Sequence, residues 1–397
     1  MRIILTAGKG GVGKSTVAAA TAARCAARGY RTLVMSIDSA HNLGDLFDLP
    51  LGHTPTPIST SLHGLEVNIN RELSDNWSAV IDFFRTMTAN NPEVSALVAE
   101  ECAVLPGMEE VFGLMRLQSV AEEGRFDVVV LDAPPTGDLL KFLRLPDVLR
   151  WFMEKYHPLE RGMLQRMRPV ADALGWPVPT GEAMAEMEYW YARVGQASRT
   201  LMDTAHASVR LVTTADRVSL AETRRAVSWT SLLGMNLDAV VVNKLLPPAD
   251  YPSPLAPWYE RQAALLQSAR EEFAGLPLLT GGLHAEELIG IEALERFGAE
   301  LYGERDAAGL WCEAPPIQWD ETESRATLRI RLPFVRKGEL RVLAAEDGLV
   351  LHIGTQRRTI PLPGAVVRRQ MRSARWDAGW LAVEYGPRGP ASPESLE

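Results

Sequence analysis

The sequence predicts an α/β protein with a mostly parallel sheet and a helical insertion, followed by a small all-β sandwich domain. Three observations lead to this fold class. Apolar segments of strand length alternate with helical patterns over residues 1–303, as in a parallel sheet covered by helices. A helical stretch rich in methionine, roughly residues 70–206, interrupts that alternation. Beyond a proline-containing linker at 304–316 the hydrophobic period becomes two, and residues 317–386 carry short strands separated by turns.

The first predicted strand and helix enclose a glycine-rich loop that is typical of phosphate binding. Residues 2–7 form a short apolar strand, and the alanine-rich residues 15–27 predict a helix. The intervening pattern G-x-x-x-x-G-K-[ST], which we call the P-loop, is filled by Gly8, Lys9, Gly10, Gly11, Val12, Gly13, Lys14, Ser15 and Thr16. Successive backbone N–H groups and the helix N-terminus of such a loop attract an anion. We expect Lys14 to reach the β- and γ-phosphates of ATP and Ser15 to bind Mg²⁺.

Two carboxylates follow later predicted strands. Residues 31–37 lead into Asp38, and residues 126–131 lead into Asp132. Ligands of an open parallel sheet bind beyond the carboxyl ends of its strands. We therefore expect Asp38 to orient the attacking water and Asp132 to hold the magnesium shell. The alternative is that each aspartate only caps a following helix.

These segments resemble the ArsA family of ATPases, part of the deviant P-loop class that also includes MinD, ParA and the nitrogenase iron protein. Residues 8–16 read G-K-G-G-V-G-K-S-T, with an additional lysine at the front of the loop. Residues 38–47 read D-S-A-H-N-L-G-D-L-F and resemble the family's switch I. Residues 132–143 read D-A-P-P-T-G-D-L-L-K-F-L and resemble its switch II. Three positions depart from the family's patterns: Ser39, Ala133 and Asp138.

Further matches extend the resemblance to about residue 303. They are P-G-M-E-E at 106–110, S-L-A-E-T-R at 219–224 and V-V-V-N-K at 240–244. The resemblance implies that Lys9 crosses a homodimer interface to the partner's nucleotide, and that Asn243 contacts the base. The residues alone leave two other interpretations open, a solvated loop lysine at Lys9 and an ordinary strand-end turn at Asn243.

Composition argues against several classes of partner and cofactor. A net charge of −9 over 397 residues argues against nonspecific nucleic-acid binding. The sequence holds no apolar run of membrane-spanning length, and the first predicted strand begins at residue 2, so we expect a cytoplasmic protein. Cys25, Cys102 and Cys312 are isolated from one another. We therefore expect neither the zinc clamp of the family's tail-anchored-protein targeting branch nor the cysteine triad of its arsenite-pump branch.

The helical stretch at 70–206 is a candidate groove for a hydrophobic polypeptide. Methionine is unbranched and polarizable, which suits surfaces that bind varied apolar ligands. The alternative is that these side chains belong to the core. The stretch holds nine of the chain's 13 methionines: Met87, Met108, Met115, Met153, Met163, Met167, Met184, Met187 and Met202.

The C-terminal strands resemble the small-heat-shock (α-crystallin) fold. The resemblance rests on L-P-F-V at 332–335, I-P-L-P at 360–363 and A-R-W-D-A-G-W-L at 374–381. The alternative is a generic β-sandwich or interaction module. We expect the polar residues 387–397 to form a disordered tail.

Together these features predict an ATP-hydrolysing homodimer that couples nucleotide-driven closure to the binding of a hydrophobic polypeptide client, as a chaperone or targeting factor. A membrane receptor is a further partner that the sequence leaves open. One alternative is the ATPase motor subunit of a metalloid or anion efflux pump, against which the dispersed cysteines argue. The other is a nucleotide-controlled interaction scaffold, against which Lys14, Asp38 and Asp132 argue.

Overall fold

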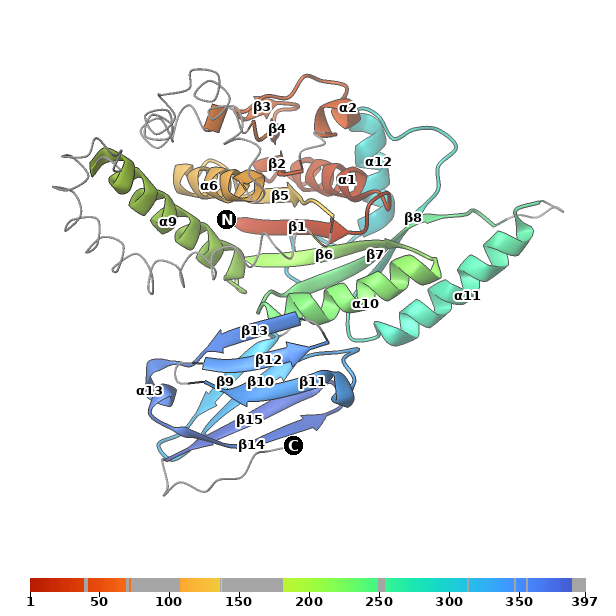
Figure 1. Ribbon diagram of the computed structural model, residues 1–397. Coiled ribbons are helices and arrows are strands. Elements are labelled where there is room, and N and C mark those ends of the chain that lie inside the picture. Colours follow the sequence, from red (N-terminus) through yellow and green to blue (C-terminus); the bar gives the residue numbers. More distant parts are fainter. Residues whose placement is uncertain are drawn as a thin grey trace, which may run out of the picture.

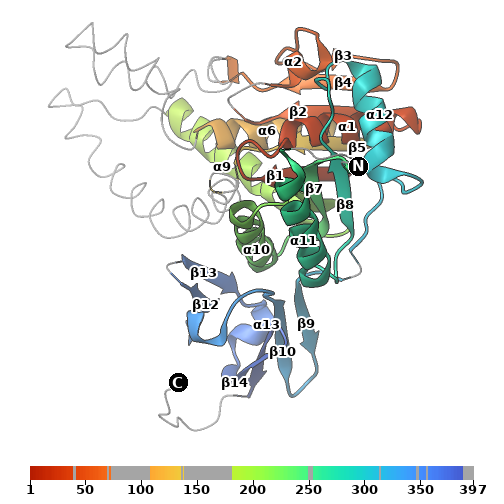
Figure 2. The same ribbon diagram turned by 90° about the vertical axis from the view of Figure 1, so that its right-hand side faces the viewer.

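A computed structural model shows two domains joined side by side (Figures 1 and 2). The larger is an α/β domain and the smaller is a β domain that begins at residue 317. The structure describes residues 1–38, 42–68, 71–72, 108–135, 137, 181–248, 254–312, 314–345, 348–354 and 356–387.

One eight-stranded sheet forms the centre of the larger domain (Figure 1). Its order is β3-β4-β2-β5-β1-β6-β7-β8, and every neighbouring pair is parallel except β3–β4. Central strands are buried on both faces, as their valine, isoleucine and leucine content requires. The strands are β1 (Arg2–Gly8), β2 (Thr32–Ser36), β3 (Thr56–Pro57), β4 (Leu62–Glu66), β5 (Val128–Asp132), β6 (Ala207–Thr214), β7 (Leu237–Leu245) and β8 (Leu278–Gly282).

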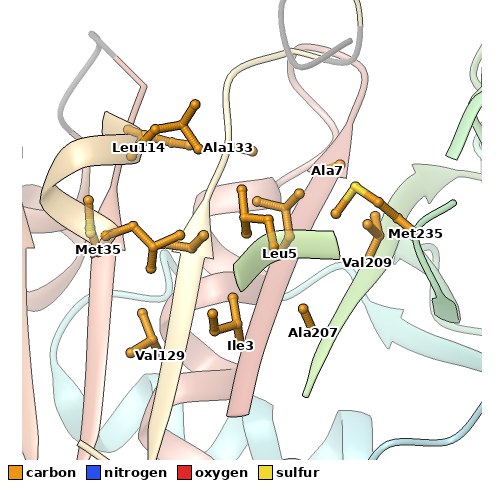
Figure 3. Packing of buried hydrophobic residues seen from close by; sticks show 14 of the residues in the cluster. Ile3, Leu5, Ala7, Met35, Leu114, Val129, Ala133, Ala207, Val209 and Met235 are labelled. Carbon is orange, nitrogen blue, oxygen red and sulfur yellow. The ribbon is translucent and has the colours of Figure 1, made fainter. Parts of the chain in front are cut away.

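Helices cover both faces of this sheet. On one face α1 and α12 pack closely, because Gly298 of α12 leaves room for the carbonyl of Ala20, which a Cβ would approach to 2.6 Å. On the other face α6 packs onto the sheet, and Figure 3 shows Leu114 of α6 close to Ala133, the residue after β5. The described helices of this domain are α1 (Lys14–Ala27), α2 (Leu43–Phe47), α6 (Met108–Glu123), α9 (Gly181–Met202), α10 (Arg217–Leu232), α11 (Ala256–Glu272) and α12 (Ile291–Tyr302). Within the described ranges, no helix combines the length and apolar character needed to cross a bilayer.

The β domain consists of two antiparallel sheets, with orders β14-β15-β10-β9 and β11-β12-β13. The period-two pattern is realised in β10, where Leu328 and Ile330 are buried while Arg329 between them is exposed. This arrangement confirms the predicted α/β domain followed by a small β domain. Its elements are β9 (Ile317–Glu321), β10 (Ala326–Arg331), a 3₁₀ turn (Lys337–Glu339), β11 (Leu340–Ala344), β12 (Gly348–Ile353), β13 (Gln356–Pro361), α13 (Gly364–Val367), β14 (Gln370–Asp377) and β15 (Trp380–Gly386).

Helix α10 joins the two domains. It lies between the large sheet and the β domain in both views (Figures 1 and 2). Leu232, in its last turn, is buried in the core of the β domain. The Ser228 hydroxyl donates to the carbonyl of Pro333, and the ring of Phe334 stands edge-on to Phe273 with centroids 5.4 Å apart. The β domain therefore rests on the helix that carries the S-L-A-E-T-R motif.

Residues 304–312, the first part of the predicted linker, pack against the α/β domain. Asp238 is fully buried and forms ion pairs with Arg2 at 2.7 Å and Arg210 at 3.0 Å. The Arg210 guanidinium also donates to the Gly309 carbonyl and lies 4.3 Å from the ring centre of Trp311. This segment continues the larger domain, because buried charges of the sheet require its carbonyl and indole as partners.

Candidate active site

The sequence-predicted site residues meet at the carboxyl edge of the large sheet. The P-loop follows β1, Asp132 ends β5, and Asp38 lies two residues beyond β2. Asp132 is level with Thr6 on one neighbouring strand and with Ser36 on the other. Parallel pairing in this register brings three segments that are far apart in sequence to one edge, where such sheets bind ligands.

The P-loop is shaped by glycines at positions that exclude a side chain. A Cβ at Gly8 would collide with the carbonyl of Val212 on β6. Gly11 and Gly13 have φ of 82° and 92°, in the left-handed region that glycine adopts readily. The next residue, Lys14, begins α1 and is buried, while Ser15 is half-buried. The loop thus ends at a helix N-terminus, as a phosphate site requires.

The end of β7 supports the loop from the side. The Asn243 side-chain amide donates to the Val12 carbonyl at 3.0 Å, and a Cβ at Gly13 would lie 2.5 Å from the same nitrogen. Lys244, which adopts φ 57°, directs its ammonium to the Gly11 carbonyl at 2.8 Å. Sequence reasoning assigned Asn243 to the base and missed Lys244. The signal was present as the lysine that follows the asparagine in the V-V-V-N-K segment.

Asp132 is the most perturbed carboxylate of the site. Its side chain is fully buried, and neither oxygen accepts a hydrogen bond from the described residues. Burial raises the pKa of Asp132 to about 6. The Ser15 hydroxyl and the Lys14 charge oppose that rise, and the charge of Asp38 adds to it. A buried carboxylate with two open oxygens beside a P-loop serine fits a hydrated divalent cation, which would supply the missing hydrogen-bond donors through its waters.

The two remaining predicted groups lie in more open positions. The Asp38 side chain is half-buried, and its backbone N–H donates to the Ser36 hydroxyl at 3.3 Å. Lys9 is half-buried at the front of the loop, where Gly10 and Gly11 are exposed. The switch residues Ser39 and Asp138 lie outside the described ranges, as do the other residues of switch II beyond Gly137.

The family is decided by matches over most of the chain. A model of the ArsA family, described as an anion-transporting ATPase, matches residues 1–303, and an HSP20-like domain found in ArsA proteins matches residues 323–385. The chain belongs to the ArsA ATPase family. It is therefore an ATPase.

Relatives of this ArsA-family ATPase carry two kinds of name. A Chlorobaculum tepidum protein named as an arsenical pump-driving ATPase is 34% identical over 392 residues, which cover 97% of this chain and 96% of the relative. A Prosthecochloris vibrioformis protein of the same name is also 34% identical over the same shares. A Trypanosoma cruzi ATPase named as an ASNA1 homolog is 28% identical over 77% of this chain and 92% of its own length.

Part of the predicted client groove of this ArsA-family ATPase lies in the core. Met115 on α6 is buried, and the ring of Phe112 meets Trp190 of α9 edge-on at 4.9 Å. Tyr189 is 55% exposed and lies on the outer side of α9. The other methionines predicted for the groove lie outside the described residues or are half-buried or without described side chains: Met87, Met108, Met153, Met163, Met167, Met184, Met187 and Met202.

The cysteines occupy separate places in this ArsA-family ATPase. Cys25 is buried in α1, and Cys312 is half-buried next to Trp311. Cys102 lies outside the described residues. Among the residues that the structure describes, no group of three histidine, cysteine, aspartate or glutamate side chains is placed to hold a metal ion.

Proposed function

We propose that this ArsA-family ATPase is a homodimeric chaperone or targeting factor that couples ATP-driven closure to the binding of hydrophobic polypeptide segments. The observation that carries this proposal is the junction between its two domains. Helix α10 of the ATPase buries Leu232 in the core of the HSP20-like domain. An HSP20-like domain packed directly on a nucleotide-binding domain suits a protein that handles polypeptides more than it suits a motor subunit alone.

In this proposal the site hydrolyses ATP through positioning and charge. The N–H groups of the P-loop and Lys14 hold the phosphates, and Asp38 orients the attacking water and accepts its proton. Asp132 and Ser15 would hold Mg²⁺, which, when bound, would supply charge stabilisation for the phosphates. Asn243 and Lys244 keep the loop carbonyls turned away from the phosphates by occupying them with hydrogen bonds. Lys9 acts across the dimer interface on the partner's nucleotide.

The client proposal is tested by crosslinking. A photoreactive hydrophobic peptide is added to the full-length protein with and without a nonhydrolysable ATP analogue, and labelled residues are identified by mass spectrometry. We expect labels within residues 70–206 that change with nucleotide, because an amphipathic helix presents its apolar face to a groove of adaptable side chains. Labels confined to residues 314–386 would move the client site to the HSP20-like domain. Absence of crosslinks in every state would favour the scaffold alternative.

The pump-motor alternative has one specific observation in its favour, the printed names of the Chlorobaculum tepidum and Prosthecochloris vibrioformis relatives. It requires a soft-metal site that stimulates the ATPase. We expect neither arsenite nor antimonite to change the ATPase rate, because Cys25 is buried in α1 and Cys312 lies in a different segment. Saturable stimulation that disappears in Cys102→Ser would make the pump motor the better assignment.

A further inference from the structure

A pocket of about 540 Å³ lies between the two domains, at the opposite edge of the large sheet from the P-loop. Its walls include the residues that precede β7 and β8, the end of β10 and the start of β15. Between the domains they also include Arg305, Trp311, Cys312, Ala314 and Pro316. We call it the interdomain pocket. Its volume is in the range of pockets that enclose small organic ligands.

Two guanidinium groups line the interdomain pocket from opposite domains. Arg305 comes from the segment packed on the ATPase, and Arg331 ends β10 of the HSP20-like domain. No carboxylate of the described residues forms an ion pair with either one. Two cationic side chains that face one cavity, with no ion-pair partner among the described residues, favour an anion with two or more oxygens, which guanidinium groups bind through paired hydrogen bonds.

One residue that lines the same pocket carries a buried acceptor. Asn236 is only 4% exposed and lines the cavity. Its amide nitrogen donates to the Thr204 carbonyl at 2.6 Å, which settles the orientation of the side chain. Its Oδ1 is buried and accepts no hydrogen bond from the described residues. A buried acceptor without a donor is costly, and a ligand N–H or O–H group would remove that cost.

Part of the remaining lining is apolar. Leu276 and Pro277 come from the ATPase, and Trp380 comes from the HSP20-like domain. Trp311 is held in place on the ATPase side, because Arg210 lies 4.3 Å from its ring centre. An apolar body would be buried against these side chains while its anionic group meets the arginines.

We propose that the interdomain pocket binds a small organic anion with an apolar body, a carboxylate or phosphate group that meets Arg305 and Arg331, and an N–H or O–H group that donates to Asn236. This site is independent of the ATP site and of the client proposal. Because its walls come from both domains, an occupant contacts the ATPase and the HSP20-like domain at once.

The proposal is tested by calorimetry on the full-length protein with four probes. They are 4-hydroxyphenylacetate and 4-hydroxyphenyl phosphate as anions, 4-hydroxyphenylacetamide as the neutral match, and tyramine as the cationic match. We expect saturable binding of at least one anion. The neutral amide should bind at least about tenfold more weakly, because a hydrogen bond to a charged group contributes a factor of about ten or more in affinity. Tyramine should not bind. Comparison of the two anions distinguishes a carboxylate site from a phosphate-ester site.

Single substitutions of the pocket arginines test whether the anion binds in the interdomain pocket. Arg331→Gln and Arg305→Gln should each weaken the anion about 10- to 100-fold. Arg305 is exposed, so its replacement does not threaten folding. Arg329→Gln is the matched control, because Arg329 lies two residues earlier on β10 and lines a different cavity. Unchanged affinity in both pocket variants, or an equal loss in Arg329→Gln, would overturn the proposal.

Cys312 gives a second readout, because it lines the same pocket. Alkylation of the Cys312 peptide by iodoacetamide, followed by mass spectrometry, should slow when the anion is present in the wild-type protein. At the same concentration, the anion should protect Cys312 from alkylation far less in the Arg331→Gln variant. Absence of saturable binding by either anion up to about 10 mM, a weak limit for specific ligands, would refute the assignment.

Discussion

Replacing Asp132 with asparagine should stabilise the nucleotide-free protein while it removes activity. The side chain is fully buried, and burial raises its pKa from 3.8 to about 6. Each pKa unit corresponds to about 1.4 kcal/mol, so the ionised carboxylate costs the folded protein about 3 kcal/mol relative to the unfolded chain. The amide introduced by Asp132→Asn carries no charge at any pH, so this variant escapes the cost.

The sign of the pH dependence follows from the direction of the shift. A raised folded-state pKa means that the folded protein binds the proton more tightly than the unfolded chain. In the wild-type protein, the contribution of protonated Asp132 to stability is therefore fully present below pH 3.8. It is lost as pH rises through about 6. The free energy of unfolding of Asp132→Asn, minus that of the wild type, should grow by about 2.4 kcal/mol between pH 4 and pH 8.

The assay is urea unfolding of both proteins at several pH values in EDTA without nucleotide. Only the difference between the two proteins is used, because all other titrating groups are common to both. Asp127→Asn is a control for which the expected change in stability has the opposite sign. Asp127 lies just before the same strand, and the hydrogen bond from Arg31 lowers its pKa to about 2. That variant should be less stable than the wild type at neutral pH. If Asp132→Asn gains no stability from pH 4 to pH 8, the burial argument is wrong.

Three further predictions concern catalysis. Asp38→Asn should keep Mg-ATP binding and lose hydrolysis by roughly 10²–10⁴-fold in a steady-state phosphate-release assay; near-normal turnover would remove its assignment as the water-orienting group. Lys14→Ala should lose nucleotide binding in its own subunit, whereas Lys9→Ala should fold and bind nucleotide but fail to close the ATP-bound dimer. In mixed dimers that pair a Lys9→Ala subunit with an Asp38→Asn subunit, activity at the first site supports action across the interface, and its absence contradicts it. Lys244→Ala should raise the KM for ATP several-fold with a smaller effect on kcat, because the loss of its hydrogen bond to the Gly11 carbonyl loosens the loop before nucleotide binds.

Local chemistry explains why the core of the site could be predicted. The P-loop is a contiguous pattern in which glycines, a lysine and a serine have separate physical reasons for their positions. Asp38 and Asp132 were found because strands that end in a carboxylate point to one edge of a parallel sheet. The structure places all of these residues at that edge, whereas the roles proposed for them stay predictions.

Other features depend on segments that are distant in sequence. The support of the loop by Lys244 requires β7 to lie beside β6 and the P-loop, an order that no local pattern specifies. The packing of residues 304–312 depends on the buried ion pairs of Asp238, which lies far earlier in the chain. The local sequence of this proline-containing segment does not indicate that the Gly309 carbonyl and the Trp311 indole contact Arg210 of the sheet.

By itself the sequence determined the fold class, the P-loop motif and the family, because these rest on periodicity and on contiguous motifs. Only the tertiary structure decided that Asp132 is buried, with neither oxygen hydrogen-bonded among the described residues, that α10 carries the HSP20-like domain, and that Arg305 and Arg331 line one cavity. The physical reason is that burial and charge pairing are properties of surfaces brought together by folding. Neither is contained in the few residues on each side of a motif.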